Sequence, residues 1–122
     1  MSAVQPVQIA ASGRNLRIVE ELQRDVYWCH MHASALPGHR PCFSLDLVED
    51  VLDYQQQLGE RLRRRAEPTA SAHLVLASDH HAFNLGGDLE LFSRLIRNQD
   101  RAGLLHYASQ CVRGAYGFHD GF

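Results

Sequence analysis

The chain has 122 residues, of which 45% are hydrophobic and 21% are charged, and its formal net charge at pH 7 is −2. This length allows one domain, and this composition excludes wholesale disorder, a collagen-like repeat and a disulfide scaffold. All 12 basic residues are arginine, so there is no lysine for a Schiff base or a phosphate-binding loop, and the charge balance does not indicate nucleic acid as a partner.

The N-terminal residues and the cysteines bear on cellular location. Residues 1–14 lack the basic and apolar segments of a secretion signal, and no apolar run is long enough to cross a bilayer. Cys29, Cys42 and Cys111 show no paired spacing, which is typical of free thiols in a reducing compartment. We interpret Cys29 and Cys111 as core residues, and Cys42, close to Arg40, as the more reactive thiol. We expect a cytoplasmic protein.

The first part of the chain predicts an arm followed by a β-hairpin. Residues 1–13 are mostly small or polar, and we expect a flexible arm there, ahead of a single core over residues 14–122. Residues 16–19 and 26–32 are rich in β-branched and aromatic types, and a polar turn separates them. Two strands joined by so short a turn predict a hairpin.

A long amphipathic helix is predicted next, from Ser44 to about Arg65. Ser44 is a suitable N-cap, Asp46 suits the positive end of the helix dipole, and Pro68 prevents the helix from continuing. The stripe that recurs at three- and four-residue steps comprises Leu47, Val48, Val51, Leu52, Gln55, Leu58 and Leu62. The arginine run over residues 61–65 is interpreted as a solvated helix end, with contact to a phosphorylated partner as the alternative.

The second half predicts a buried strand followed by further helices. Residues 72–77 form a continuous apolar run, typical of a strand that is buried on both faces. A strand, a helix and a strand in this order predict a βαβ unit, and therefore an α/β fold. After a loop over residues 78–87, we expect Asp88 to cap one helix, and Asp100 to cap another beyond a break at residues 98–100.

The segment that suits chemistry is the loop before the helix capped by Asp88, with the sequence AFNLGGDL at residues 82–89. Gly86 and Gly87 allow a sharp main-chain turn and the close approach of a ligand. The first amides of the following helix point outward without intrahelical partners, and the helix dipole lies behind them. Such a place suits a developing negative oxygen, as in an oxyanion hole, although the same pattern also occurs in plain turns.

Residues 83–89 (FNLGGDL) resemble the first fingerprint of the crotonase (enoyl-CoA hydratase) superfamily, in which an aromatic residue, two residues, Gly, a small residue, Asp and an apolar residue follow a strand. Residues 40–45 (RPCFSL) are similar to the family's proline-containing loop before its first long helix. Within the superfamily the nearest likeness is to synthases of diffusible signal factor. The further segments that support this subgroup are residues 1–6, 23–28, 30–32, 75–79 and 101–114.

The resemblance implies the crotonase spiral of ββα units, of which this chain would form the N-terminal portion. It implies an acyl thioester of coenzyme A (CoA) or acyl carrier protein as substrate, with no cofactor, and two backbone N–H groups that hold the thioester oxygen. Leu85 matches the first of these donors, and Gly86, Gly87 and Asp88 line the same turn. The synthase would dehydrate a 3-hydroxyacyl thioester and hydrolyse the thioester to release a cis-2-unsaturated fatty acid, a quorum-sensing signal.

The same resemblance places other parts of the site elsewhere. The family's second oxyanion glycine and its two catalytic glutamates would lie beyond residue 122, so we assign no catalytic side chain here. An ordinary enoyl-CoA hydratase or isomerase is one alternative, and a non-catalytic half-crotonase that serves as an interaction module is another. For the complete enzyme the resemblance implies a homotrimer or hexamer and a sensor kinase as a further partner; we expect no nucleic acid or membrane partner.

Histidines suggest a second kind of site. His30 and His32 share one face of a predicted strand, and His80 and His81 lie together in a loop. Imidazole is a common zinc ligand, but no third or fourth ligand occurs at a recognisable spacing. We therefore expect no metal site, and interpret these residues as a half-exposed strand and a polar loop.

Overall fold

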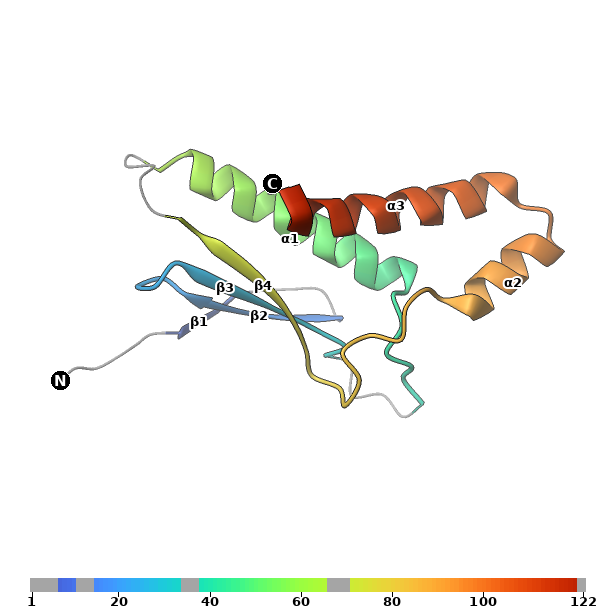
Figure 1. Ribbon diagram of the computed structural model, residues 1–122, viewed down its shortest axis with the longest axis horizontal. Helices are drawn as coiled ribbons and strands as arrows, with labels where there is room; N and C mark the ends of the chain where they lie inside the picture. The colour runs from blue at the N-terminus through green and yellow to red at the C-terminus, as the bar shows by residue number, and fades with distance from the viewer. Residues whose placement is uncertain (1–6, 11–14, 34–37, 66–70, 121–122) are drawn as a thin grey trace.

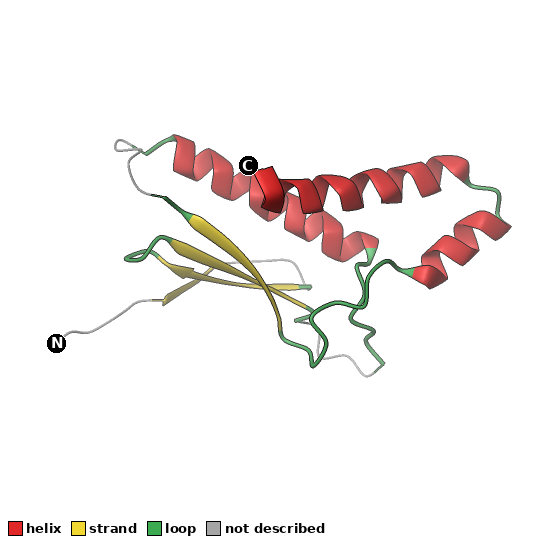
Figure 2. Cartoon of the chain, viewed as in Figure 1, coloured by secondary structure: helices red, strands yellow, loops and turns green. Residues whose placement is uncertain are grey.

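The described residues of the chain form a four-stranded sheet and three helices, an α/β arrangement (Figure 1, Figure 2). The computed structural model describes residues 7–10, 15–33, 38–65 and 71–120. The elements are β1 (Val7–Ala10), β2 (Leu16–Glu21), β3 (Val26–Met31), α1 (Leu45–Arg63), β4 (His73–Ser78), α2 (Leu89–Arg97) and α3 (Arg101–Asp120). The strands lie in chain order, α1 covers one face of the sheet, and α3 packs along α1. None of the helices within the described residues has both the length and the apolar character that a bilayer span requires.

The predicted hairpin is confirmed. β2 and β3 are antiparallel, with Ile18 opposite Cys29. Alternate side chains of both strands turn toward α1, because successive side chains of a strand point to opposite faces of the sheet. The buried members of this set are Leu16, Ile18 and Glu20 from β2 and Tyr27, Cys29 and Met31 from β3. Asp25 closes the hairpin turn with a left-handed φ of 58°.

β1 lies within the range where we expect a flexible arm. Its main chain pairs antiparallel with β2, with Val7 opposite Glu21 and Ala10 opposite Ile18. Valine and isoleucine alternate with other residues over this short segment, a pattern that suits the open edge of a hairpin. Residues 1–6 and 11–13 of the expected arm lie outside the described part of the chain.

The predicted long helix is confirmed as α1, and the Ser44 side chain caps it by accepting a hydrogen bond from the Leu47 N–H at 3.2 Å. Five of the seven residues in the predicted stripe are buried, and Leu52 and Leu62 are half-buried. Tyr54, which lies outside the predicted stripe, is buried as well. The predicted stop at Pro68 lies outside the described residues.

The interpretation of the arginine run as a solvated helix end misses the intramolecular partners of two of its four arginines, Arg61 and Arg65. Arg61 forms an ion pair with Glu20, which is only 1% exposed and also accepts a hydrogen bond from the Tyr54 hydroxyl at 2.7 Å. Arg65 donates to Asp25 at 2.7 Å. These long side chains turn back to the sheet because it holds buried carboxylates that need a partner. Arg63 and Arg64 are exposed, as expected.

β4 pairs parallel with β3, which confirms the predicted βαβ unit. The expectation that this strand is buried on both faces is wrong: His73 is exposed and the other residues are half-buried. The reason is its place in the sheet, since among the described strands β4 has β3 as its one neighbour. His73 donates its N–H to the Asp25 carbonyl and Asp79 to the Met31 carbonyl, both at 2.9 Å. By alternation, Leu74 and Leu76 direct their main-chain groups to the open edge.

The two C-terminal helices begin where the sequence predicts. Asp88 caps α2 by accepting from the Leu91 N–H at 3.1 Å, and Asp100 accepts from the Gly103 N–H at 2.8 Å at the start of α3. The two helices differ in packing. α3 lies along α1 and buries Tyr107, whereas every residue of α2, all of them described, is at least partly exposed. The α2 region, which comprises the preceding turn and α2 itself (residues 82–97), therefore projects from the body formed by the sheet, α1 and α3 (Figure 1).

Candidate functional site

The structure brings the four sequence-predicted site residues together in one turn between β4 and α2. Gly86 has a left-handed φ of 98°, a conformation that favours glycine, and no described atom would obstruct a side chain there. Gly87 forms a parallel bridge with Phe43, just before α1. A Cβ on Gly87 would lie 3.2 Å from the Phe92 ring, so this position is tightly packed. The first glycine therefore sets the direction of the turn, and the second lets it pack against α2.

Main-chain hydrogen bonds close this turn onto the segment before α1. The Leu85 N–H donates to the Pro41 carbonyl at 2.7 Å, and the Phe43 N–H donates to the Gly86 carbonyl at 2.7 Å. The Gly86 N–H has a longer contact, 3.3 Å, with the Asn84 side-chain oxygen. The N–H predicted as an oxyanion donor is thus already paired with a neutral carbonyl of the same chain. A ligand oxygen can accept a hydrogen bond from this N–H only if the hydrogen bond to the Pro41 carbonyl breaks.

Tyr107 of α3 ties the turn to the body of the protein. Its hydroxyl donates to the Phe43 carbonyl and accepts from the Asp88 N–H at 2.9 Å. The ring packs edge-on against Phe92, with centroids 5.1 Å apart, and the side chain is 1% exposed. Burial raises the pKa of Tyr107 to about 12, so the hydroxyl remains protonated and can donate at neutral pH.

Sequence reasoning missed Tyr107 as a site residue. A signal was present, since Leu104, Tyr107, Cys111 and Gly114 recur at three- and four-residue steps, and all four are buried or half-buried. Nothing in that periodicity says that a hydroxyl would reach the turn between β4 and α2, because Phe43 and Tyr107 are 64 residues apart in the chain.

The outer surface of the turn is apolar. Leu85 is 66% exposed and Leu89 74% exposed, and Phe83 is exposed beside them. Arg40 lies at the edge of this surface, 3.0 Å from the Glu90 carboxylate and 3.6 Å from that of Asp88. The site therefore combines polar main-chain groups with exposed hydrophobic side chains, as a place for a ligand with a polar head and an apolar chain does.

Histidines gather at the carboxyl ends of β3 and β4. His32 follows β3 and is buried, and its Nδ1 lies 3.4 Å from Nε2 of His39. The ring of His80, which follows β4, lies edge-on with its centroid 6.5 Å from that of His32. His30 instead faces Asp79, which Arg17 holds through two hydrogen bonds of 2.9 and 2.8 Å. No group of three or more His, Cys, Asp or Glu side chains in the described ranges is arranged to hold a metal ion.

Burial raises the pKa of each of the three thiols. Burial raises the pKa of Cys29 to about 12, and Cys29 lies in the core as predicted. Burial and the Asp88 carboxylate raise the pKa of Cys42 despite the opposing effect of Arg40. Burial also raises the pKa of Cys111, which is half-buried on α3. The neighbouring Arg40 therefore does not lower the pKa of Cys42 below its ordinary value, because desolvation outweighs the guanidinium. That Cys42 is the most reactive of the three thiols stays a prediction.

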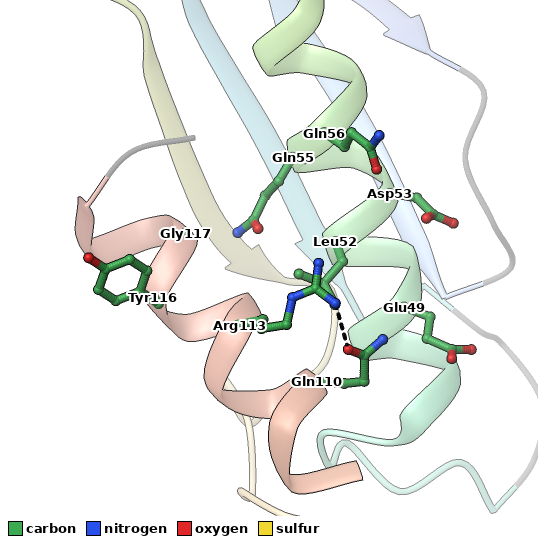
Figure 3. Close-up of a pocket in the computed structure, with 9 residues that line it drawn as sticks. All are labelled: Glu49, Leu52, Asp53, Gln55, Gln56, Gln110, Arg113, Tyr116 and Gly117. Atoms are coloured by element: carbon green, nitrogen blue, oxygen red, sulfur yellow. Dashed lines mark hydrogen bonds between the residues drawn. The ribbon is translucent and has the colours of Figure 1, made fainter. Parts of the chain in front are cut away.

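A separate groove of about 630 Å³ runs between α1 and α3 (Figure 3). Its lining residues are Glu49, Leu52, Asp53, Gln55, Gln56, Gln110, Arg113, Tyr116 and Gly117. Gln55 donates to the Gly114 carbonyl at 3.0 Å. A Cβ on Gly117 would clash with the side-chain oxygen of Gln55, so glycine at this position makes room for the Gln55 side chain. None of the four sequence-predicted site residues borders the groove.

Comparison with known proteins adds no family to this description: no protein-family model matches the chain, and no curated protein matches it significantly. The geometry of the turn and the resemblance described above are what bears on function.

Proposed function

We propose that this chain is the N-terminal portion of a crotonase-type enzyme that dehydrates 3-hydroxyacyl thioesters and then hydrolyses the thioester to release a cis-2-unsaturated fatty acid. The observation that carries the proposal is the turn over residues 85–88. It joins the carboxyl end of a parallel strand to a capped helix through a left-handed glycine. Ligands of α/β proteins commonly bind at the carboxyl ends of such strands.

In this proposal the turn holds the thioester oxygen, and groups outside this chain transfer the protons. The Leu85 N–H must then leave the Pro41 carbonyl, which it contacts at 2.7 Å. A neutral hydrogen bond contributes about 0.5–1.5 kcal/mol and one to a charged group about 1.5–3 kcal/mol. The exchange is therefore close to neutral for a ground-state thioester and favourable for an enolate or tetrahedral oxyanion. Such a difference is what lowers a barrier rather than merely binding substrate.

The apolar surface beside the turn supports an acyl substrate. Leu85 and Leu89 are largely exposed, and Phe83 extends this surface toward the end of β4. An acyl chain, or another part of the complete enzyme, would remove these side chains from water, which stabilises the complex by about 25 cal/mol for each Å² covered. The main-chain donors would hold the thioester head while the apolar side chains contact the chain.

A product assay tests the proposal against its alternatives. The protein purified from its natural source is incubated with 3-hydroxyacyl carrier protein and, separately, with 2-enoyl-CoA, and products are identified by mass spectrometry. Free cis-2-enoic acid is the expected product. Hydration of 2-enoyl-CoA without release of free acid would favour an ordinary hydratase, and no turnover of either substrate would favour a non-catalytic interaction module.

A pair of variants at Leu85 tests the role of its N–H in that enzyme. Leu85→Pro removes the donor and is expected to lower kcat for thioester turnover by about 10²–10³-fold. Leu85→Ala keeps the N–H and should retain most of the activity, since the side chain is not the donor. Circular dichroism and Tm confirm folding of both variants. A folded Leu85→Pro enzyme with an unchanged rate would refute the assignment.

A further inference from the structure

His32 combines an unusual backbone conformation with a buried imidazole ring. It follows β3 directly, has a left-handed φ of 60°, and is 3% exposed. Its Nε2 is buried without a hydrogen-bond partner among the described residues. A non-glycine residue in this conformation is uncommon, and an unpaired buried nitrogen is costly, so the surrounding loops must hold the ring in place.

Two loop segments meet at this ring: residues 38–43, which lead into α1, and residues 79–88, which follow β4. His39 approaches Nδ1 of His32 at 3.4 Å from the segment that leads to Pro41. His80 presents its ring edge-on from the loop after β4, and its own Nδ1 is held by the Ala82 N–H at 3.2 Å. The same two loops are joined further along by the hydrogen bond between Leu85 and Pro41. Contacts around His32 therefore bear on whether the turn over residues 85–88 is closed.

We propose that His32 is a pH-sensitive latch: its neutral imidazole lets the two loops close over it, and protonation drives them apart and opens the turn. The titratable groups that face His32 are His39 from the first loop and His80 from the second. Both are imidazoles, so a proton on His32 meets no compensating carboxylate among them. Asp79, which directly precedes His80 in the chain, is paired with Arg17.

The direction of the pH effect follows from burial. Desolvation, followed by the effects of His39 and His80, lowers the pKa of His32 below its ordinary value of 6.5, and the main chain of Phe83 offsets this only in part. The open state takes up a proton more readily than the closed state. The stability of the closed loops is therefore fully present above pH 6.5 and declines as the pH falls from there through the lowered pKa.

Hydrogen exchange of the 122-residue chain, followed by mass spectrometry and corrected for the intrinsic pH dependence of exchange, tests this proposal. Peptides covering residues 38–43 and 79–88 are expected to lose protection as the pH falls from about 7.5 to about 5.5, by up to about tenfold per pH unit, the limit for one proton. Peptides from α1 serve as an internal reference and should not change.

His32→Asn is the matched variant, because asparagine tolerates a left-handed φ and does not titrate. It is expected to abolish the pH dependence, whereas His81→Gln, at an exposed position whose ring contacts His80, should keep it. If His32→Asn does not fold, His80→Gln gives the same information: with one imidazole fewer, the midpoint of opening should move to higher pH. Unchanged protection in the wild type, or a pH dependence that persists in His32→Asn, would overturn the proposal.

Discussion

The interface between α1 and the sheet differs in kind from the α2 region. The first is closed by apolar side chains and by two ionic groups in which the carboxylate is buried and the arginine is partly exposed: Glu20 with Tyr54 and Arg61, and Asp25 with Tyr27 and Arg65. The second exposes Leu85, Leu89 and Ile96 and depends on main-chain hydrogen bonds around two glycines. Both regions belong to one chain, yet only the first has the packing that makes a fold stable by itself.

The stability of this molecule lies in its packed body, and its exposed apolar surface lies around α2. A large part of the folding free energy comes from burial, so the sheet, α1 and the inner face of α3 support the fold. The α2 region contributes little burial, and its exposed apolar side chains are available for contact with another molecule. A surface of this kind commonly marks a place of interaction.

The largest contrast is expected between two leucines, one from each region. Leu58→Ala removes a fully buried side chain from α1 and should lower the free energy of unfolding by about 2–5 kcal/mol, because it leaves a cavity. Leu89→Ala, on α2, should change it by less than about 0.5 kcal/mol. Urea unfolding followed by circular dichroism measures both. Equal effects of the two variants would show that α2 is packed and would contradict the comparison.

A smaller effect is expected at the tie between the regions. Tyr107→Phe removes the hydroxyl that bonds the Phe43 carbonyl and the Asp88 N–H, and should cost about 1–3 kcal/mol because buried polar groups lose their partner. Hydrogen exchange at the Asp88 amide, measured by nuclear magnetic resonance, should accelerate. Tyr116→Phe, at an exposed position on the same helix, is the control and should leave that amide unchanged.

The smallest effect concerns acid stability. The Arg65 hydrogen bonds, helped by the Tyr27 hydroxyl, hold the pKa of Asp25 below its ordinary value of 3.8. This carboxylate contributes stability above pH 3.8, and the contribution is lost as the pH falls from there through the lowered pKa. Arg65 is partly exposed, so the effect should stay below about 1 kcal/mol.

Asp25→Asn tests this effect, since asparagine also tolerates the left-handed φ of 58° at this turn. The variant should show a shallower loss of stability than the wild type between about pH 4 and pH 2 in urea titrations. Identical pH profiles of the two proteins would mean that the contact with Arg65 does not contribute to the free energy of unfolding.

Much of the fold could be predicted because it depends on neighbours in sequence. The caps at Ser44, Asp88 and Asp100 each bond an amide three residues further on, so a local pattern is enough to identify them. The hairpin and the βαβ unit follow from periodicity and turn residues in the same way. The glycine turn was also predictable as a turn, since Gly86 needs its left-handed φ wherever it lies in the molecule.

What the sequence alone determined, then, is which segments form strands and helices, where the helices begin and where the chain turns, because these depend on contacts a few residues apart. Only the tertiary structure decided that Arg61 and Glu20 pair across 41 residues, that β4 is an edge strand, and that the Leu85 N–H donates to the Pro41 carbonyl. Tyr107 and His32 acquired their roles in the same way. Such partners are distant in sequence, and the packing of the whole chain, rather than any local pattern, brings their atoms within hydrogen-bonding distance.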